Sequence, residues 1–400
     1  MQEETQKYIE ENSAKNNYFQ TFKISSRFEK LVAGKMYGGE ILNTSSELNK
    51  LFEEKISQYK ELSGDGVQFP KTLIGLLGTL EYKKLKKEFG ERLAIQFNRG
   101  HTGQGTVFVS NEDDLKTLQN VYPDREVRIA EFVKGIPYTI NACVYMGKVY
   151  AGGLSYQITG EKELTNFEGG TVGNDFSFRE GFTDGDQDGA NSGTYNEIYK
   201  QAKLIGEKMA LKGYVGLFGI DFILDESGKV IIIEINARQP ASIPFHTKLQ
   251  LEAKQIPLSM LHLMAFLDIR ENIDPKDYSL QAMQPINASQ VFKRNLTSSP
   301  VLVDSEVKTG EYVIQSGMSQ TVEGKAYRLQ NMEEMRLIYK NYAYNISQIA
   351  GNSILLLTQK QGKRVNPGNE LMRIQTKQGV VANGGSLKTW IINVFKSITQ

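Results

Sequence analysis

The sequence predicts an α+β fold, because strand-type and helix-type patterns follow one another along most of its length. Two apolar, β-branched runs, residues 217–224 and 229–235, flank a four-residue turn and predict a β-hairpin. A glycine-rich stretch joins two further apolar runs, residues 93–97 and 106–109. Residues 196–212, before the hairpin, carry apolar side chains at helical spacing. These patterns together predict both β-strands and α-helices.

The composition limits the classes of protein that the chain can represent. Its 400 residues are enough for two or three domains. The 47 basic and 46 acidic residues nearly balance, and no basic patch typical of nucleic-acid-binding proteins is visible. From this balanced charge we expect no nucleic-acid partner. The single cysteine, Cys143, excludes an internal disulfide framework and predicts a reducing, cytoplasmic location.

Membrane, secretion and zinc signals are not found in the sequence. No apolar run approaches the roughly 18–20 residues that cross a bilayer, so we expect no membrane partner. The first residues are polar and acidic, unlike a secretion signal. The three histidines, His101, His246 and His262, are widely separated, which argues against a zinc site.

The predicted elements begin with a helix that a capping box opens. Residues 44–47 read Thr-Ser-Ser-Glu, and apolar side chains then recur at helical spacing as far as Leu62. Gly64 and Gly66 end this helix. We then expect a helix over residues 80–89, strands over residues 93–97 and 106–109, and a short helix over residues 111–120.

The glycine-rich stretch lies between two strands. Residues 98–105 read Asn-Arg-Gly-His-Thr-Gly-Gln-Gly. A Walker loop leads from a strand into a helix and ends in Gly-Lys-Ser/Thr, and a Rossmann fingerprint also needs a following helix, so neither is present. The stretch is therefore either a flap whose backbone N–H groups close over phosphates or an ordinary hairpin tip.

Further strands and helices are expected in the remainder of the chain. The expected strands are residues 128–135, 138–145 and 149–155, and the expected helices are residues 196–212 and 257–267. Residues 157–195 are irregular and form either a wall of a substrate pocket or a surface loop. Residues 239–246 are expected to form a loop, in which His246 is either a general base or a structural side chain. Beyond these we expect a linker over residues 274–285, strands over residues 288–292, 312–315, 353–359 and 371–375, and an amphipathic helix around Trp390.

The hairpin carries acidic side chains within apolar strands. If the turn sets the register, Leu224 lies opposite Lys229 and Asp221 lies opposite Ile232. Glu234 then lies diagonally from Asp221 on the same face, about 7–8 Å away between backbones.

Asp221, Glu234 and Asn236 together predict a metal site. Buried carboxylates repel one another and are costly to desolvate unless a positive charge lies between them. Oxygen ligands of this kind suit Mg²⁺, which binds through one or two carboxylates together with substrate phosphates. The alternative is an exposed sheet face on which Glu234 and Asn236 point into solvent.

The arrangement resembles the metal-binding end of the ATP-grasp superfamily. There an acid on one strand is followed by Glu-x-Asn on the next strand, as in Asp221, Glu234 and Asn236. The extended string that includes Arg238 is most similar to the biotin carboxylase and carbamoyl phosphate synthetase branches. The D-alanine ligase branch has an arginine two residues before the first acid, where this chain has Gly219.

The resemblance implies ATP and Mg²⁺ (or Mn²⁺) as cofactors and assigns the site residues. Asp221, Glu234 and Asn236 would hold the metal, and Arg238 would act in catalysis on the carboxylate or acyl phosphate. The residues implied in nucleotide binding are Lys55, Gln96, Arg99, Gly100, His101, Gly103, Gly105, Glu131, Phe132 and Val133.

The role of two of these residues has a second interpretation. Lys55 is either a phosphate-binding lysine or an ordinary solvated helix lysine. Gln96 stands where the family usually has a lysine, and glutamine brings no charge. Either Arg99 or His101 supplies the positive group, or nucleotide binding is altered.

The resemblance also implies a division of the chain. Residues 1–70 would be a truncated Rossmann-like segment, residues 71–127 the lid subdomain, residues 128–275 the metal and substrate subdomain, and residues 286–400 a small β-rich domain.

The implied function is ATP-dependent ligation. A small-molecule carboxylate would be activated as an acyl phosphate and joined to an amine or thiol. Alternatives are a biotin-carboxylase-like or kinase-type phosphoryl transfer, or a non-catalytic nucleotide-binding subunit. A homodimer or a partner subunit is compatible with the sequence.

Overall fold

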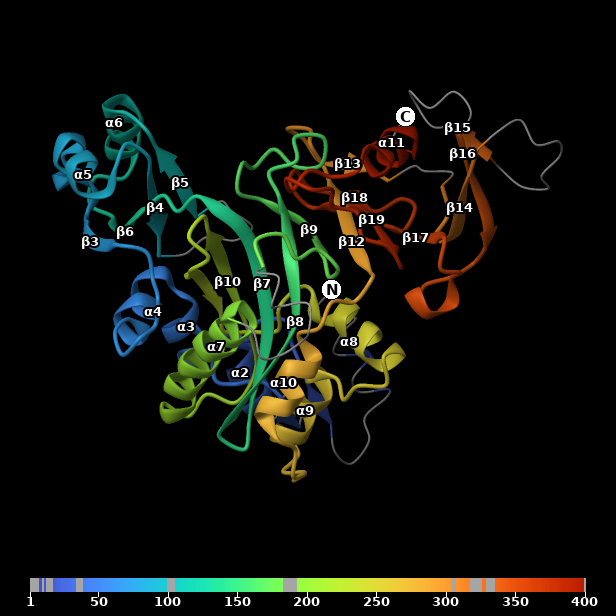
Figure 1. Cartoon of the computed structure of the whole chain (residues 1–400), viewed down its shortest axis with the longest axis horizontal. Coiled ribbons are helices and arrows are strands. Elements are labelled where there is room, and N and C mark those ends of the chain that lie inside the picture. The colour runs from blue at the N-terminus through green and yellow to red at the C-terminus, as the bar shows by residue number, and fades with distance from the viewer. Residues whose placement is uncertain are drawn as a thin grey trace.

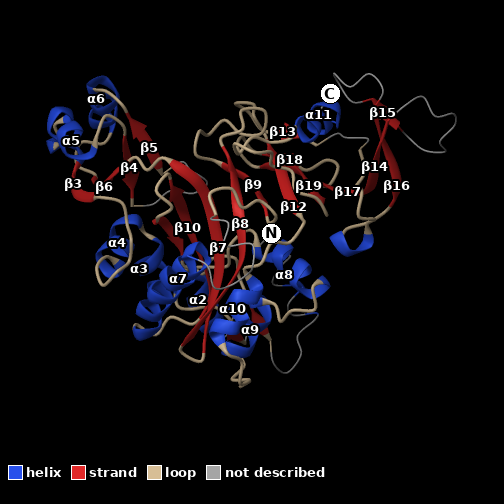
Figure 2. Cartoon of the chain, in the orientation of Figure 1, coloured by secondary structure: helices blue, strands red, loops and turns tan. Residues whose placement is uncertain are grey.

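The computed structural model contains two principal β-sheets with helices packed on their faces (Figures 1 and 2). It describes residues 7–8, 11, 17–33, 39–98, 105–182, 193–303, 307–316, 326–328 and 335–398. The mixture of helices and strands confirms the expected α+β class. Among the described residues, no helix has the length and apolar character needed to span a membrane.

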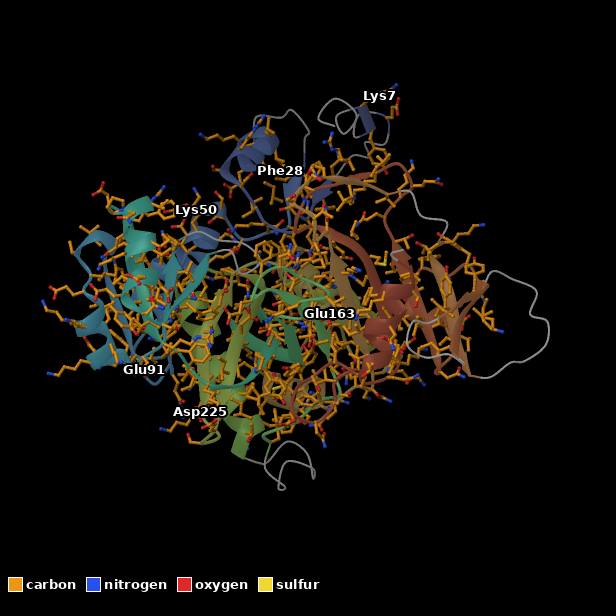
Figure 3. The ribbon with its side chains drawn as sticks, turned by 90° about the horizontal axis from the view of Figure 1, so that it is seen from above. Lys7, Phe28, Lys50, Glu91, Glu163 and Asp225 are labelled. Carbon is orange, nitrogen blue, oxygen red and sulfur yellow. The ribbon has the colours of Figure 1, made fainter. Side chains whose placement is uncertain are left out.

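The N-terminal part contains short elements. Strand β1 (Tyr18–Phe19) pairs in parallel with β2 (Glu40–Ile41), and helix α2 (Ser26–Ala33) lies between them in the chain. Helices α3 (Ser46–Glu53) and α4 (Lys55–Leu62) follow. Seen from above, this part and the β10–β11 turn, marked by Phe28 and Asp225, lie on opposite sides of the molecule (Figure 3).

The helix expected to run from the capping box to Leu62 is in fact two helices. Glu54 adopts an extended conformation, with ψ of 130°, and separates α3 from α4. The cap of α3 is Ser45, whose hydroxyl accepts from the backbone N–H of Leu48 at 3.2 Å. Because of the break, Lys55 is the first residue of a helix.

A four-stranded sheet forms the upper left of Figure 1, and helices cover one of its faces. Its order is β3 (Thr72–Leu76), β6 (Glu126–Glu131), β4 (Leu93–Phe97) and β5 (Thr106–Val109). Helices α5 (Tyr82–Phe89) and α6 (Glu112–Val121) bury the face that carries Leu93, Ile95, Val127 and Ile129. The strands expected at residues 93–97 and 106–109 are confirmed.

The larger sheet has 11 strands among the described residues, in the order β11, β10, β7, β8, β9, β12, β19, β17, β14, β16, β15. Their bounds are β7 Gly135–Tyr145, β8 Lys148–Thr159, β9 Thr171–Asp175, β10 Gly216–Asp225, β11 Val230–Asn236, β12 Ser289–Arg294, β14 Gly310–Ser316, β15 Ala326–Arg328, β16 Met335–Asn341, β17 Ser353–Thr358 and β19 Glu370–Thr376. The pairing of β9 with β12 carries the sheet into the C-terminal part of the chain. The division of the chain into domains stays a prediction.

Helices cover both faces of this sheet. Helix α7 (Gly193–Leu211) packs against one face of β7 and β8, and α9 (Leu258–Phe266) packs against the opposite face of β7. The remaining elements are η1 Leu77–Thr79, α8 Ile243–Glu252, α10 Pro275–Ala282, β13 Val301–Leu302, η3 Ile346–Gln348, β18 Arg364–Val365 and α11 Thr389–Ile398.

Two expectations for the region after the hairpin are wrong. Residues 239–246 are not all loop, because α8 begins at Ile243. The expected linker at residues 274–285 contains α10. Asp274 caps this helix by accepting from the backbone N–H of Asp277 at 2.8 Å, and Pro275 occupies the first turn, where its missing N–H costs nothing.

Asp175 ties the end of β9 to the C-terminal part of the chain. One carboxyl oxygen accepts from the backbone N–H groups of Val380 and Val381, at 2.7 and 2.9 Å. The other accepts from the backbone N–H of Ser177 at 2.9 Å, its hydroxyl at 2.7 Å and the N–H of Phe178 at 3.2 Å. Asp175 is fully buried.

We expect Asp175→Ala to lower the free energy of unfolding by about 3 kcal/mol or more, because it leaves several buried donors without an acceptor. Urea denaturation measures this. Asp225→Ala is the matched control, since Asp225 accepts the same kinds of bonds from Ser227 and Lys229 in an exposed turn. Equal losses in the two variants would contradict the anchoring role of Asp175.

Candidate active site

The β10–β11 hairpin closes by a tighter turn than the sequence predicts. The backbone N–H of Asp225 donates to the carbonyl oxygen of Lys229 at 3.0 Å, so three residues rather than four connect the strands. Leu224 therefore pairs with Val230, and the expected pairing of Leu224 with Lys229 is wrong. Gly228 has a φ of +82° in this turn, in the left-handed region that favours glycine.

A β-bulge determines the direction of Glu234. Phe222 pairs with Ile232, but the next pair is Asp221 with Glu234, which leaves Ile233 as an extra residue. The expected pairing of Asp221 with Ile232 is therefore wrong. Phe222 and Ile232 are buried on the core face, so strict alternation would also point Glu234 into the core. The extra residue turns Glu234 to the face of Asp221, directly opposite it.

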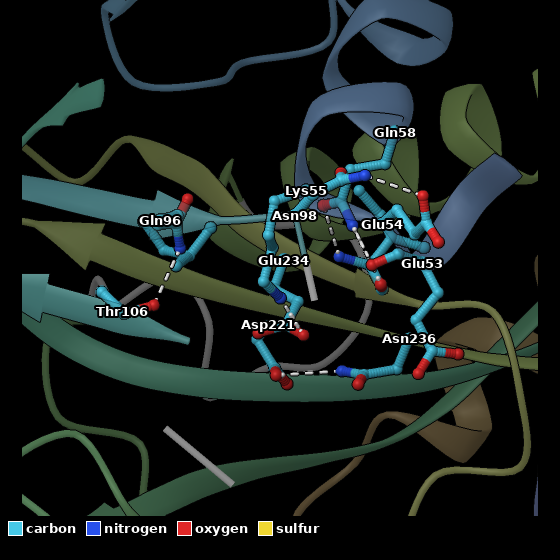
Figure 4. A network of polar contacts seen from close by, with 12 residues as sticks. Glu53, Glu54, Lys55, Gln58, Gln96, Asn98, Thr106, Asp221, Glu234 and Asn236 are labelled. Atoms are coloured by element: carbon cyan, nitrogen blue, oxygen red, sulfur yellow. Dashed lines mark hydrogen bonds and ion pairs between the residues drawn. The ribbon is translucent and has the colours of Figure 1, made fainter. Parts of the chain in front are cut away.

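Lys55 brings a positive charge to these acids. The side chain of Gln58, three residues further along α4, accepts from the N–H of Ile235 at 3.2 Å and donates to its carbonyl oxygen at 3.4 Å. These bonds fasten α4 to the edge strand β11, and the ammonium of Lys55 forms an ion pair with Glu234 (Figure 4). Lys55 is only 4% exposed, so it is not a solvated helix lysine.

Two amides hold Asp221. Gln157 Nε2 donates to Oδ1 at 2.7 Å, and Asn236 Nδ2 donates to Oδ2 at 3.0 Å. Burial of the carboxyl group and repulsion from Glu234 raise the pKa of Asp221 to about 6. A cation placed between two such carboxylates would relieve their repulsion.

Arg238 lies at the end of β11 and is also paired. Its Nε donates to Glu53 Oε1 at 3.0 Å, and its Nη2 donates to Asn236 Oδ1 at 2.7 Å. Lys23 Nζ donates to the same Glu53 oxygen at 2.7 Å, and the ring of Phe22 lies 4.7 Å from the guanidinium carbon. Although burial opposes it, the charges of Arg238 and Lys23 lower the pKa of Glu53.

A small pocket opens beside Arg238. Part of its lining comes from the N-terminal part of the chain and part from the end of β11: Ile24, Asn43, Thr44, Asn49, Ala237, Arg238 and Gln239. The pocket places a guanidinium within reach of an anionic group bound there.

The glycine-rich loop is anchored next to Lys55. Arg99, Gly100, His101 and Gly103 lie outside the described residues, whereas Gly105 is buried, and its carbonyl oxygen accepts from the N–H of Phe97 at 2.8 Å.

Asn98, the last described residue before the loop, binds the first turn of α4. Its carbonyl oxygen and Oδ1 accept from the N–H groups of Lys55 and Ile56, at 3.2 and 3.1 Å. Its Nδ2 donates to Glu54 at 2.8 Å (Figure 4). One asparagine thereby positions both Lys55 and the start of the loop.

Part of the chain matches a known protein family. Residues 52–242 match the family model described as an ATP-grasp domain. None of the curated proteins matches the sequence significantly.

Solved structures share the fold over most of the chain. The biotin carboxylase domain of the 2-oxoglutarate carboxylase of Hydrogenobacter thermophilus, solved with MgADP, ADP and bicarbonate, gives a TM-score of 0.57 at 14% identity, covering 94% of this chain and 72% of that one. The N5-carboxyaminoimidazole synthase of Aspergillus clavatus, solved with ADP and 5-aminoimidazole ribonucleotide, gives a TM-score of 0.54 at 13% identity, covering 93% of this chain and 78% of that one. The phosphoribosylamine–glycine ligase of Thermotoga maritima gives 0.50 at 13% identity, covering 91% and 79%. The chain therefore has the ATP-grasp fold.

The chain passes from the four-stranded sheet to the larger sheet directly after Glu131. Strand β6 of the four-stranded sheet leads through Phe132 and Val133 to β7 of the larger sheet. The carboxylate of Glu131 accepts from the backbone N–H of Lys71 at 2.9 Å. The ring of Phe132 lies 4.1 Å from the guanidinium carbon of Arg92. Contact of Glu131, Phe132 and Val133 with a bound nucleotide stays a prediction.

Gln96 lies on β4, shortly before the glycine-rich loop. It is 4% exposed, and its Nε2 donates to Thr106 Oγ1 at 3.2 Å across the β4–β5 pair. Its uncharged side chain leaves the face of the four-stranded sheet that α5 and α6 do not cover.

His246 is enclosed in the protein. It lies in α8, is fully buried, and stacks on Phe176 with ring centroids 5.6 Å apart. Neither ring nitrogen has a hydrogen-bond partner among the described residues. Burial lowers the pKa of His246 to about 3, so the ring stays neutral. The structural alternative, rather than the general base, fits this environment.

The predicted metal residues are brought together. Asp221, Glu234 and Asn236 lie on one face, although no group of three or more His, Cys, Asp and Glu side chains suited to a metal occurs in the described part of the chain. Two carboxylates and an amide are the donor set that suits Mg²⁺ when substrate phosphates complete its coordination. Sequence reasoning missed Glu53, Asn98 and Gln157. Glu53 and Asn98 stand beside the expected residues Lys55 and Arg99, but the contacts that give all three their roles join segments far apart in the chain.

Mn²⁺ binding to the isolated protein should weaken as the pH falls from about 7 to 5. The raised pKa means that Asp221 takes up a proton near pH 6 rather than near its ordinary value of 3.8, and the protonated group does not ligate a cation. Electron paramagnetic resonance of free Mn²⁺ measures the affinity. Asp221→Asn should bind weakly throughout, and a midpoint near pH 4 in the unaltered protein would contradict the assignment.

Asn98→Ala should weaken ATP binding about 10-fold and lower the free energy of unfolding by about 1 kcal/mol, because α4 loses its capping acceptor and the loop its anchor. Titration calorimetry and urea denaturation measure the two effects. Asn111→Ala removes a similar cap, the bond to the Asp114 N–H at 2.9 Å, at the start of α6. This control should lose stability alone, and equal loss of ATP affinity in both variants would contradict the positioning role of Asn98.

Proposed function

We propose that the protein is an ATP-dependent ligase that activates a small-molecule carboxylate and joins it to an amine or thiol. The observation that carries this proposal is the order of groups along β11 in an ATP-grasp domain. Glu234 lies opposite Asp221, Asn236 follows, and Arg238 stands at the pocket beyond the strand. Acids suited to a metal ion are thereby placed next to a cation suited to a carboxylate.

Asp221, Glu234 and Asn236 would hold Mg²⁺ or Mn²⁺. When bound, the metal ion would neutralise negative charge on the phosphates of ATP. Lys55 would exchange its ion pair with Glu234 for a phosphate oxygen once the metal takes that carboxylate. The backbone of the glycine-rich loop, including Arg99, Gly100, His101, Gly103 and Gly105, would surround the phosphates.

The reaction follows from this arrangement. An oxygen of the substrate carboxylate attacks the γ-phosphorus, the bond to the β,γ-bridging oxygen breaks, and ADP leaves. The amine then attacks the acyl carbon, loses a proton and displaces inorganic phosphate. Arg238 would orient the carboxylate and stabilise charge on the acyl phosphate, because its fork binds two oxygens at once.

Glu53 would keep Arg238 in position for this task. Its carboxylate binds Nε of the guanidinium at 3.0 Å and is itself held by Lys23 and by Asn49 Nδ2, the latter at 3.1 Å. A side chain fixed in this way loses little entropy when the substrate binds.

Small-molecule carboxylate and amine substrates, a homodimer or partner subunit, and a cytoplasmic location remain predictions from the sequence. The uncharged Gln96 favours one other function, a nucleotide-binding subunit without catalysis.

Glu234→Ala should abolish ATP-dependent ADP release in a screen of carboxylate and amine pairs, while circular dichroism shows a folded protein. The reason is that the metal loses a ligand and Lys55 its partner. In the active pair, hydroxylamine should trap the acyl phosphate as a hydroxamate. ADP release without hydroxamate would indicate a kinase, and ATP binding without ADP release on any pair would indicate the non-catalytic subunit. Unchanged turnover in Glu234→Ala would remove the metal assignment.

A further inference from the structure

Arg128 is a fully buried cation at the junction of the two sheets. It lies on β6, directly opposite Gln96 of β4, so both side chains leave the same face of the four-stranded sheet. The opposite face of this sheet is the one that α5 and α6 cover. Arg128 is 0% exposed, much like Lys55 and Gln96.

The guanidinium of Arg128 is held by weak partners. The rings of Tyr59 and Phe69 lie 5.3 and 5.2 Å from its central carbon. Nη1 donates to the carbonyl oxygen of Ile233 at 3.3 Å. Ile233 is the extra residue of the β-bulge in β11. Nε is buried without a hydrogen-bond partner among the described residues.

None of the described acids forms an ion pair with Arg128. The ion pairs of the described residues include Lys55 with Glu234 and Arg238 with Glu53, but none that involves Arg128. Burying an unpaired cation is costly, and burial accordingly lowers its pKa to about 10. Glu234 acts on Arg128 through space but forms no ion pair with it, so an anionic ligand would supply the direct charge contact that no described acid makes.

The charges near Arg128 indicate which ligand this is. Glu234, which lies opposite Asp221, acts on Arg128 through space, and a nucleoside triphosphate would add several negative charges. Lys55 is engaged with Glu234, and Gln96 is neutral. A phosphate oxygen would form a charge-assisted bond with Arg128 that is stronger than the long bond to the Ile233 carbonyl.

We propose that Arg128 is a phosphate-binding residue of the nucleotide site and supplies the positive charge that Gln96, opposite it on β4, does not carry. The inference rests on the proposed function, because it requires that the protein binds ATP. Nε and the adjacent terminal nitrogen form the fork that suits two phosphate oxygens, while Tyr59 and Phe69 keep the plane of the guanidinium fixed.

Titration calorimetry with MgATP and with adenosine tests the proposal. Arg128→Met should weaken MgATP binding about 10- to 100-fold and leave adenosine binding within about 2-fold, because only the charge-assisted phosphate bonds are lost. The double variant Gln96→Lys with Arg128→Met should recover most of the MgATP affinity, since it returns a cation to the same face from the neighbouring strand.

Arg294→Met is the matched control. Arg294 is also a buried arginine with an unpartnered Nε, but it donates to the carbonyl oxygens of Gly368 and Thr171, at 2.8 and 2.9 Å, in the C-terminal part of the larger sheet. Thermal unfolding of this variant reports the cost of losing a buried arginine. Its affinities for MgATP and adenosine should not change.

Several outcomes would overturn the proposal. Equal weakening of MgATP and adenosine in Arg128→Met would make Arg128 purely structural, and so would a double variant that folds but recovers nothing. If Arg128→Met does not fold, Arg128→Lys must weaken MgATP more than adenosine, and equal effects there overturn the proposal. Unaltered protein that binds no MgATP would remove the proposed function as well, whereas normal MgATP binding by Arg128→Met would remove this inference alone.

Discussion

The pairing of two carboxylates across one hairpin is the constraint on which the site depends. One extra residue in β11 turns Glu234 away from the core and toward Asp221. Burial and the charge of Glu234 raise the pKa of Asp221, so a nearby positive charge favours the form in which both carboxylates are ionised. Lys55 can supply that charge because the break at Glu54 makes it the first residue of α4 and Gln58 fastens that helix to β11.

The members of this site could be predicted from the sequence, but their register could not. Acids within apolar strands are rare enough to identify Asp221 and Glu234 without knowledge of their pairing. The bulge has no such signal, because the extra residue, Ile233, stands in a run of isoleucines and is chemically the same as its neighbours. The convergence of the two carboxylates is confirmed even though the expected register is wrong.

Local sequence patterns explain which of the other predicted elements and contacts are confirmed and which are not. The strands at residues 93–97 and 106–109 are confirmed because strand propensity and bounding turns agree there. The helix α10 was predictable in principle, since an Asp cap before Pro275 is a helix start, yet the same residues also suit a linker. The pairing of Glu53 with Arg238 joins residues 185 positions apart, and no pattern within either segment indicates it.

Asn236 links the acidic and basic ends of the site. Its Nδ2 donates to Asp221 and its Oδ1 accepts from Arg238, so a flipped amide would place the oxygen against a carboxylate and the nitrogen against a guanidinium. The orientation of the amide is therefore fixed by its two neighbours. The amide oxygen has two lone pairs, so Oδ1 can accept from Arg238 Nη2 and still face a cation, while Glu53 continues to hold Nε. Asn236 would therefore keep the acidic end of the site and the guanidinium in contact whether or not a cation is bound.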